Sequence, residues 1–134
     1  MKVQLDTDTC IHLIRRQRPE MLQRLKRYAP GDIGISSITL AELSFGAAKG
    51  QQHEKNKAAL NDFTAPLEIA PFDAPAAAAY GELRAALEGR ATGIGALDTL
   101  IGAHALSLKV TLVTHNTREF SRISGLRLAD WVES

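Results

Sequence analysis

The sequence predicts a single α/β domain built on a central parallel sheet, and three observations lead to this prediction. Short runs rich in aliphatic and β-branched residues, such as 3–5, 33–35 and 110–114, alternate with longer segments of helical periodicity. Turn-forming residues separate these segments along the chain. The 134 residues are enough for one hydrophobic core but not for two. Because strands joined through helices pair most simply in parallel, we expect residues 1–134 to form one three-layer α/β/α sandwich.

The first half of the chain is expected to contribute two strands and three helices. Residues 3–5 predict a strand that ends at Asp6, and an apolar helical stretch follows around residues 11–14. A second strand over 33–35 leads into a helix over about 38–49, with two serines before it as N-caps and a glycine after it as a stop. The polar segment after His53 predicts the third helix.

The second half continues the alternation of strand and helix. Residues 67–72 predict a third strand, and Asp73 with Pro75 is a typical opening of a helix. This alanine-rich helix has its predicted inner stripe at Tyr80, Leu83 and Leu87.

Two candidate site residues follow strands directly. A glycine-containing turn at 93–95 precedes a helix that carries Asp98, and residues 110–114 predict the fourth strand. Asn116 comes just after this strand, as Asp6 comes just after the first. Since functional sites of parallel sheets gather at the carboxyl ends of the strands, we expect Asp6 and Asn116 at one edge.

Composition excludes several classes of protein. Hydrophobic residues make up 45% of the chain and charged residues 23%, as in ordinary globular domains and unlike disordered or fibrous chains. The N-terminal residues lack the apolar run of a signal peptide, and no stretch is long enough to span a membrane. The single cysteine, Cys10, has no partner for an intrachain disulfide and is expected to be buried. These features predict a cytoplasmic protein without a membrane association.

The charges are unevenly distributed. Residues 15–27 carry six basic groups and one acid, a net charge of +5, which leaves −4 for the rest of a chain whose total is +1. Such a cluster is most often a solvated helix face. Beside a metal site it would instead attract phosphates, and Arg15, Arg16 and the later Arg118 are candidate contacts for nucleic-acid phosphates.

Two acids lie in predicted helices that are otherwise largely apolar. Glu42 shares a predicted face with Ile38 and Phe45, and a buried carboxylate there needs a partner, either an Arg or Lys or a cation. Asp98 lies at the start of its helix, where it is either a first-turn acid favoured by the helix dipole or a functional group. It faces Gly102 and Ala105, which leave space beside it, whereas the predicted apolar face consists of Leu97, Ile101, His104 and Leu108.

Together, Asp6, Glu42 and Asp98 indicate a hard divalent cation. Carboxylate oxygens suit Mg²⁺, for which Mn²⁺ substitutes, whereas the scattered histidines and single cysteine do not suggest a zinc site. A cation held by such acids recruits water and a phosphate oxygen, so the chemistry expected is phosphodiester hydrolysis.

Four segments resemble the PIN-domain ribonucleases, and specifically the VapC toxins of prokaryotic type II VapBC toxin–antitoxin modules. They are LDTDTCI around Asp6, ISSITLAEL around Glu42, IGALDTLIGAHA around Asp98, and VTHNTREFSRISGLRLADW, which contains Asn116. The resemblance covers nearly the whole chain, and the order and spacing of the segments make it specific.

The resemblance implies a function and roles for single residues. It implies a PIN-like sandwich and an endoribonuclease toxin that hydrolyses RNA, tRNA among the candidates, forms a homodimer and is neutralised by a VapB-type antitoxin. Asp6 and Asp98 become the principal Mg²⁺ ligands and Glu42 completes the cluster. Asn116 stands where many PIN domains have a fourth acid, so the role of that acid passes to Asp8 or Glu119. The hydroxyls expected to support the ligands are those of Thr7, Ser37 and Thr114.

Two other classes remain open from the sequence. Asp6 and Asp8 after a strand match the nucleophile and acid of a haloacid-dehalogenase-like phosphatase, but that motif is short and leaves Glu42 unexplained. The second is a non-catalytic binding module in which the basic segment binds and the acids only cap helices. Metal-dependent turnover distinguishes a nuclease from such a module.

Overall fold

The computed structural model describes residues 1–90 and 93–132 and contains a five-stranded sheet in which all neighbouring strands are parallel. The strand order is β3-β2-β1-β4-β5, so the first strand of the chain lies at the centre. Val3 of β1 is in register with Ile33 of β2 and with Thr111 of β4. The strands are β1 Val3–Leu5, β2 Ile33–Ser36, β3 Glu68–Ala70, β4 Thr111–Val113 and β5 Leu128–Ala129.

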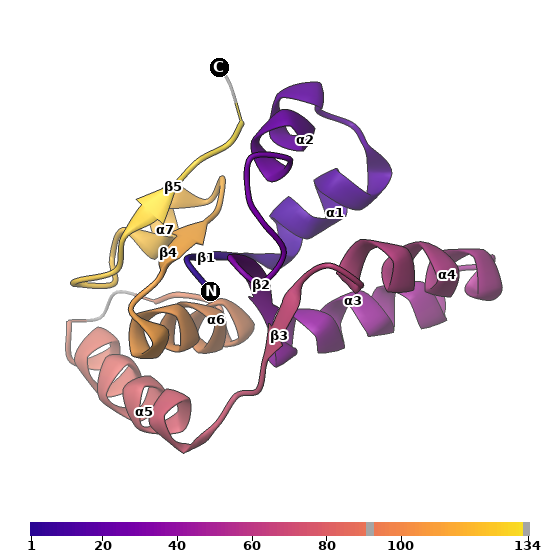
Figure 1. Ribbon diagram of the computed structural model, residues 1–134. Helices are drawn as coiled ribbons and strands as arrows, with labels where there is room; N and C mark the ends of the chain where they lie inside the picture. The colour runs from indigo at the N-terminus through magenta and orange to yellow at the C-terminus, as the bar shows by residue number, and fades with distance from the viewer. Residues whose placement is uncertain (91–92, 133–134) are drawn as a thin grey trace.

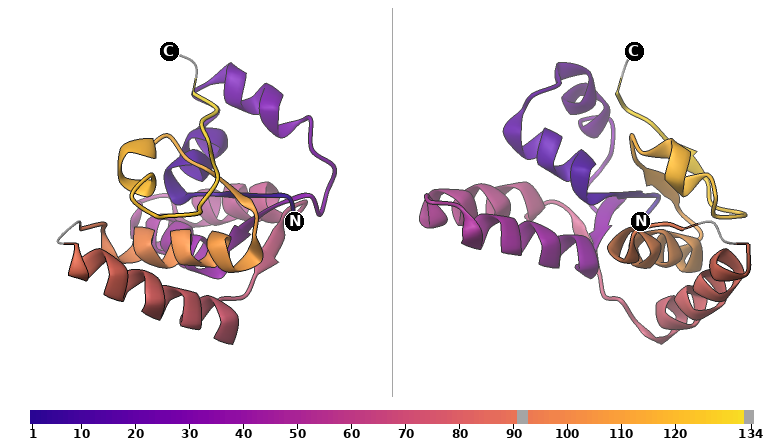
Figure 2. Two further views of the ribbon diagram at one scale, coloured as in Figure 1. Left: turned by 90° about the vertical axis from the view of Figure 1, so that its left-hand side faces the viewer. Right: turned by 180° about the vertical axis from the view of Figure 1, so that it is seen from behind.

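Helices cover both faces of the sheet, as expected for a three-layer α/β/α sandwich (Figures 1 and 2). One layer consists of α1 Thr7–Arg15, α2 Pro19–Leu25, α3 Ser37–Lys49 and α4 His53–Thr64. The other consists of α5 Ala74–Gly89, α6 Ala96–Leu108 and the short α7 Thr117–Phe120. In the portion of the chain that the structure describes, no helix combines the length and apolar character that a membrane span requires.

Each face of the sheet has its own hydrophobic core. Alternate residues of a strand point to opposite faces, so Val113 packs among α1–α4 and its neighbour Leu112 among α5–α7. The predicted burial of Cys10, Leu83 and Leu87 is confirmed, with Tyr80 partly buried beside the two leucines. This double coverage leaves the carboxyl edge of the strands as the place where polar side chains gather.

The predicted strands and helices are confirmed in order, and only β3 and β4 are shorter than expected, but two apolar faces were predicted wrongly. Phe45 is 66% exposed, so the buried face of α3 contains Thr39 and Leu43 instead. On α6, Leu97 and Leu108 are 46% and 36% exposed. The reason is that α6 turns its small residues to the interior, and its buried residues are Thr99, Ile101, Gly102, Ala103, His104 and Ala105.

Gly102 has a different role from the one predicted. A Cβ at this position would come within 2.5 Å of Ile123 Cδ1 and 3.5 Å of the Phe120 ring. The glycine therefore allows the segment around α7 to approach α6 closely, and the space is filled by side chains rather than left beside Asp98.

Three elements were not predicted as separate units. The basic segment 15–27 divides into the end of α1 and the whole of α2, because Arg16 adopts a left-handed conformation with φ 54°. Both α7 and β5 are too short for periodicity to reveal, at four and two residues. The two-residue β5 nevertheless extends the parallel sheet beyond β4.

Candidate active site

Asp6 links the central strand to the first helix. Its backbone N–H donates to the Val113 carbonyl at 3.0 Å, and its Oδ1 accepts the Thr9 N–H at 2.8 Å as the N-cap of α1. The side chain is only 4% exposed. Burial raises the pKa of Asp6, and the Asp8 charge adds to this, whereas hydrogen bonds from Thr114 and Thr9 oppose it. Asp6 is thus a fixed, buried carboxyl at the centre of the carboxyl edge.

Asp98 shows how closely the acids are gathered. Burial at the start of α6 is the largest cause that raises its pKa to about 6. The remaining causes are the negative charges of four other carboxylates, those of Asp6, Glu119, Glu42 and Asp8. The end of β1 and the helices α1, α3, α6 and α7 therefore bring five acids close enough to disfavour each other's ionisation.

Glu42 is partly buried on α3 and is held by the hydroxyl group of Thr7. Thr7 donates a hydrogen bond to Glu42 Oε1 at 2.6 Å, and the Thr39 hydroxyl lies 3.3 Å from that of Thr7. Among residues 1–90 and 93–132, no Arg or Lys forms an ion pair with Glu42, so the ordinary salt bridge considered above is not present. Thr39 was not among the predicted site residues, although its position one turn before Glu42 on the same helix was the available signal.

Asn116 supports one acid of the group. It precedes α7, and its backbone N–H donates to Thr114 Oγ1 at 2.9 Å. Its Nδ2 donates to Glu119 Oε2 at 2.6 Å. Thr114 is fully buried and also hydrogen-bonds Asp6, so a short polar chain runs from Asp6 to Glu119. An amide at position 116 can thus orient an acid without adding a charge.

The other predicted residues contact different segments of the chain or face solvent. Ser37 Oγ accepts the Phe72 N–H at 3.0 Å, so this hydroxyl connects α3 to the segment after β3. Arg16 and Arg118 are exposed. Arg15 is exposed at the end of α1 and lines, together with Glu42, a cavity of about 230 Å³ between α1, α3 and α4.

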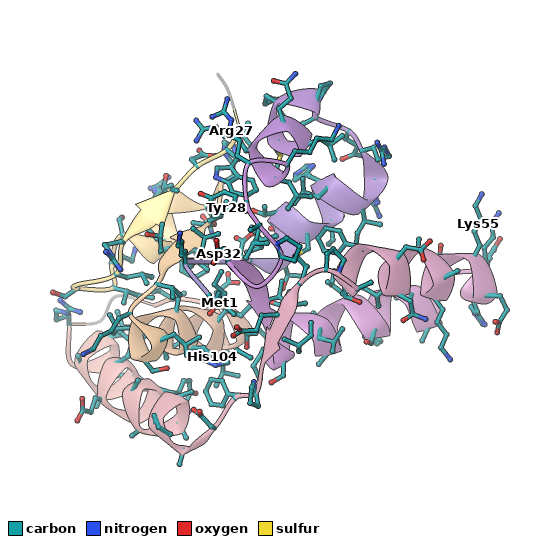
Figure 3. All side chains as sticks on the ribbon, viewed as in Figure 1. Met1, Arg27, Tyr28, Asp32, Lys55 and His104 are labelled. Atoms are coloured by element: carbon teal, nitrogen blue, oxygen red, sulfur yellow. The ribbon has the colours of Figure 1, made fainter. Side chains whose placement is uncertain are left out.

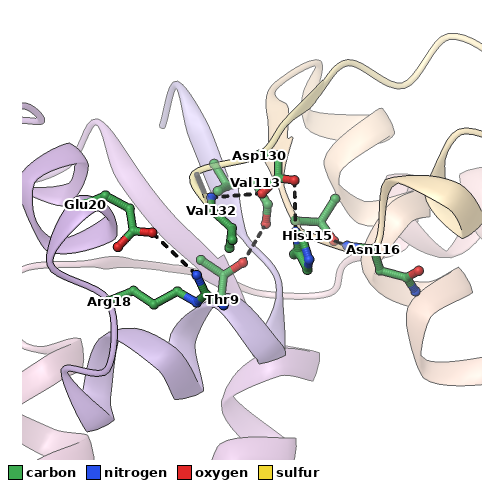
Figure 4. Close-up of polar contacts among 9 residues, drawn as sticks. Thr9, Arg18, Glu20, Val113, His115, Asn116, Asp130 and Val132 are labelled. Carbon is green, nitrogen blue, oxygen red and sulfur yellow. Dashed lines mark hydrogen bonds and ion pairs between the residues drawn. The ribbon is translucent and has the colours of Figure 1, made fainter. Parts of the chain in front are cut away.

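The residues that follow β4 and β5 form a further polar contact at the carboxyl edge of the sheet. Figure 4 shows His115 joined to Asp130, with Nδ1 and Oδ2 2.9 Å apart, and the Thr9 hydroxyl directed at the Val113 carbonyl. Asp130 Oδ1 also accepts the Val132 N–H at 2.9 Å. These contacts fix the ends of the last two strands beside the acids.

The donor set fits a hard divalent cation, although the carboxylates do not converge to ligand distances. Within the two described stretches of the chain, no three acidic, histidine or cysteine side chains are arranged closely enough to enclose an ion. Two of the acids turn to neutral donors, Glu42 to Thr7 and Glu119 to Asn116. Carboxylates that repel each other are expected to turn toward neutral hydrogen-bond donors. A bound cation would draw their free oxygens toward it.

Comparisons with known proteins agree with this geometry. Residues 3–126 match the PIN-domain family. The chain is 39% identical over 131 residues to the tRNA(fMet)-specific endonuclease VapC of Shigella flexneri, and the match covers 98% of each chain. The chain belongs to the VapC ribonucleases of the PIN-domain family.

Further relatives of this PIN domain show the same relationship. Ribonuclease VapC2 of Rickettsia felis is 41% identical over 128 residues, which cover 95% of this chain and 96% of that protein. The solved structure of VapBC2 from Rickettsia felis, bound to a DNA fragment from its promoter, matches with a TM-score of 0.93 and 40% identity. That match covers 98% of this chain and 100% of the other. None of these matches supports the alternative of a haloacid-dehalogenase-like phosphatase.

Proposed function

We propose that this VapC-type ribonuclease depends on a divalent cation, Mg²⁺ or Mn²⁺ in its place, held by Asp6, Glu42 and Asp98. The observation that carries the proposal is the Asp98 carboxyl, whose pKa is raised to about 6 by burial and by four neighbouring acids. Ionised carboxylates at this density are unfavourable without a compensating positive charge, and no Arg or Lys among the described residues pairs with Glu42. A divalent cation supplies that charge with the oxygen ligands it prefers.

The remaining acids and hydroxyls have supporting roles in this proposal. Thr7 and Thr114 orient the Glu42 and Asp6 carboxylates through hydrogen bonds and leave lone pairs on their oxygens for ligation. Asp8 and Glu119 are the acids available to a second cation. Asn116 replaces a charge with an amide that holds Glu119.

The chain's own groups determine where hydrolysis takes place. When bound, the cation supplies Lewis-acid chemistry by activating water and stabilising charge on a phosphate. Asp6 is fixed to β4 and to the first turn of α1, so it gives the site a rigid reference point. The pKa of Asp98 is raised to about 6 in the metal-free protein, so below that pH a proton competes with the cation for this carboxyl.

The RNA is expected to approach along the basic side of the site. Exposed Arg15 and Arg16 at the end of α1, and Arg118 on α7, are suited to phosphate contacts. The Shigella flexneri relative is a tRNA(fMet)-specific endonuclease, and from this likeness we infer that a tRNA is the substrate. Structured RNA of this kind offers the unstacked bases of its loops to a protein.

Partners follow from the solved relatives, which are VapBC complexes. We infer that a VapB-type antitoxin inhibits this chain by covering the acidic edge, and that the toxin is a homodimer. An arginine from the antitoxin would pair with carboxylates that otherwise hold the cation.

The test is cleavage of tRNA(fMet) with and without chelation. EDTA should stop cleavage and added Mg²⁺ or Mn²⁺ should restore it. Water as the nucleophile leaves a 5′-phosphate and a 3′-hydroxyl, and blocking the 2′-hydroxyl at the cut position should not prevent cleavage. His115→Ala, which removes an exposed imidazole at the rim, should retain the chemistry. Cleavage that continues in EDTA and yields a 2′,3′-cyclic phosphate would overturn the proposal.

A further inference from the structure

A buried hydrogen bond joins the start of α3, the helix of Glu42, to the middle of α6, the helix of Asp98. Ser36 Oγ and His104 Nδ1 are 2.7 Å apart, and both residues are fully buried. Ser36 ends β2 and is the N-cap of α3, where its Oγ accepts the Ile38 N–H at 3.1 Å. Figure 3 labels His104 on α6. From the sequence, His104 was predicted only as a member of the apolar face of its helix.

The chemistry of the pair explains why an imidazole is present. Burial lowers the pKa of His104, although the Asp73 carboxylate and the Pro71 carbonyl oppose this, so the ring is neutral. A neutral ring can accept the Ser36 proton at Nδ1 while Ser36 Oγ accepts from Ile38. The opposite ring nitrogen, Nε2, is buried without a hydrogen-bond partner among the described residues. A leucine or phenylalanine would fill this space without burying an unpaired nitrogen, so packing alone does not account for the imidazole.

Three polar contacts link the elements that carry the three proposed ligands. Thr7 and Glu42 join α1 to α3. Gln4 Nε2 donates to the Ile101 carbonyl at 3.1 Å and so joins β1 to α6. The Ser36–His104 bond joins α3 to α6 and is the third of these contacts among residues 1–90 and 93–132. Each ligand-bearing element is thereby tied to the other two.

We propose that the Ser36–His104 hydrogen bond sets the separation of the Glu42 and Asp98 carboxylates, which makes His104 a positioning residue for the cation. Glu42 follows Ser36 by six residues and Asp98 precedes His104 by six. Each carboxylate is therefore about 9 Å along its helix from the contact, and a rigid helix transmits a shift over that length. The inference rests on the proposed metal dependence and adds the element that holds the ligands apart.

A matched pair of substitutions tests the proposal. His104→Asn keeps an acceptor, Oδ1, near the position of Nδ1, whereas His104→Gln places its amide near Nε2 and loses Ser36. Both bury one amide, so their effects on thermal unfolding should be similar. Calorimetric titration of the full chain with Mn²⁺, without RNA, should show a loss of affinity on the order of tenfold for His104→Gln. His104→Asn should retain the wild-type affinity.

Ser36→Gly tests the same contact from the other side, because glycine is tolerated at an N-cap while the hydroxyl is removed. It should weaken Mn²⁺ binding as His104→Gln does, and the double variant should bind no more weakly than either single variant. If neither His104 variant folds, Ser36→Gly decides alone, and wild-type affinity in that variant overturns the proposal.

The remaining outcomes separate this inference from the proposed function. Equal Mn²⁺ affinities for the folded His104→Asn and His104→Gln variants, whether both fall or neither does, would overturn the positioning role and leave the metal site intact. A wild-type protein that binds no Mn²⁺ would overturn the metal site and the positioning role together.

Discussion

Thr7 donates a hydrogen bond to Glu42 Oε1 at 2.6 Å, across the contact between α1 and α3. Thr7 directly follows Asp6, so the same turn of the chain contains one proposed ligand and orients another. A relative shift of α1 and α3 would move both acids at once.

Thr7→Val should weaken metal binding because it removes the donor while nearly conserving the shape of the side chain. We expect the Mg²⁺ concentration for half-maximal cleavage to rise on the order of tenfold, as for other groups that orient ligands. Thr7→Ser keeps the hydroxyl and is the matched control. An unchanged Mg²⁺ dependence in the valine variant would show that Glu42 needs no orientation by Thr7.

Neutralising a proposed ligand should abolish cleavage without unfolding the protein. Asp6→Asn and Glu42→Gln conserve size but remove charge that the cation needs, so tRNA cleavage should fall on the order of 100-fold or more. Circular dichroism should show the wild-type helix content. A folded variant with full activity would remove that residue from the site.

Asp98→Asn should make the metal-free protein more stable near neutral pH. The pKa of Asp98 is about 6 in the folded protein, above the ordinary 3.8 that applies when the chain is unfolded. The protonated carboxyl therefore favours the folded state below that ordinary pKa, and this contribution is lost as the pH rises through the folded pKa. The asparagine that replaces it carries no charge at any pH.

The stability advantage of the Asp98→Asn variant should therefore develop between about pH 4 and about pH 6 and persist above it, at roughly 1 kcal/mol after allowance for solvent screening. Thermal unfolding of the wild-type and variant proteins in EDTA across this range measures it. A difference that does not vary with pH would contradict the proposed environment of Asp98.

Metal binding should depend on pH through the same carboxyl. A proton and the cation compete for Asp98, whose pKa is about 6 in the metal-free protein. Mn²⁺ affinity should therefore fall below that pH, approaching about tenfold per pH unit if one proton is displaced. Calorimetric titration at several pH values checks this, and constant affinity through this range would show that Asp98 does not bind the ion.

Expression of the chain alone should arrest bacterial growth, because a VapC-type ribonuclease without its inhibitor destroys RNA. Co-expression of a VapB-type partner encoded beside it should relieve the arrest. Asp6→Asn, expressed to the same level, is the control that separates the effect of catalysis from the cost of protein overexpression. Normal growth with abundant, soluble wild-type protein would count against the toxin assignment.

The general position of the site could be predicted from the sequence because topology determines it. Asp6 follows a short apolar strand, and carboxyl ends of parallel strands share one edge whatever the packing above them. Glu42 and Asp98 could be noticed because each is a carboxylate in a largely apolar helix. In the structure the negative charges of Asp6 and Glu42 both raise the pKa of Asp98, so the three acids lie near one another. The sequence pattern thus identified the strand or helix in which each acid lies, and it placed Asp6 at the carboxyl edge of the sheet.

The partners of these acids could not be predicted, because they come from distant parts of the chain. Glu42 is bound by Thr7, 35 residues away, rather than by an arginine. Phe45 is exposed since the interior face of α3 is set by α1, α4 and α6, which periodicity within α3 does not describe. Ser36 and His104 are 68 residues apart, and the local sequence around either residue does not predict their contact.

The central position of β1 has a consequence for the time at which the enzyme becomes active. Asp6 is held by the Val113 carbonyl, and β1 is completed on that side only by β4, with Val3 opposite Thr111. At about 5 to 20 residues per second, roughly 5 to 20 s of synthesis separate these segments. During that interval the growing chain has made Asp6 and Glu42 but not the strand that fixes Asp6. Because Asp6 is a proposed ligand, we expect the nascent chain to remain inactive as a nuclease until the late strand has emerged and paired with β1.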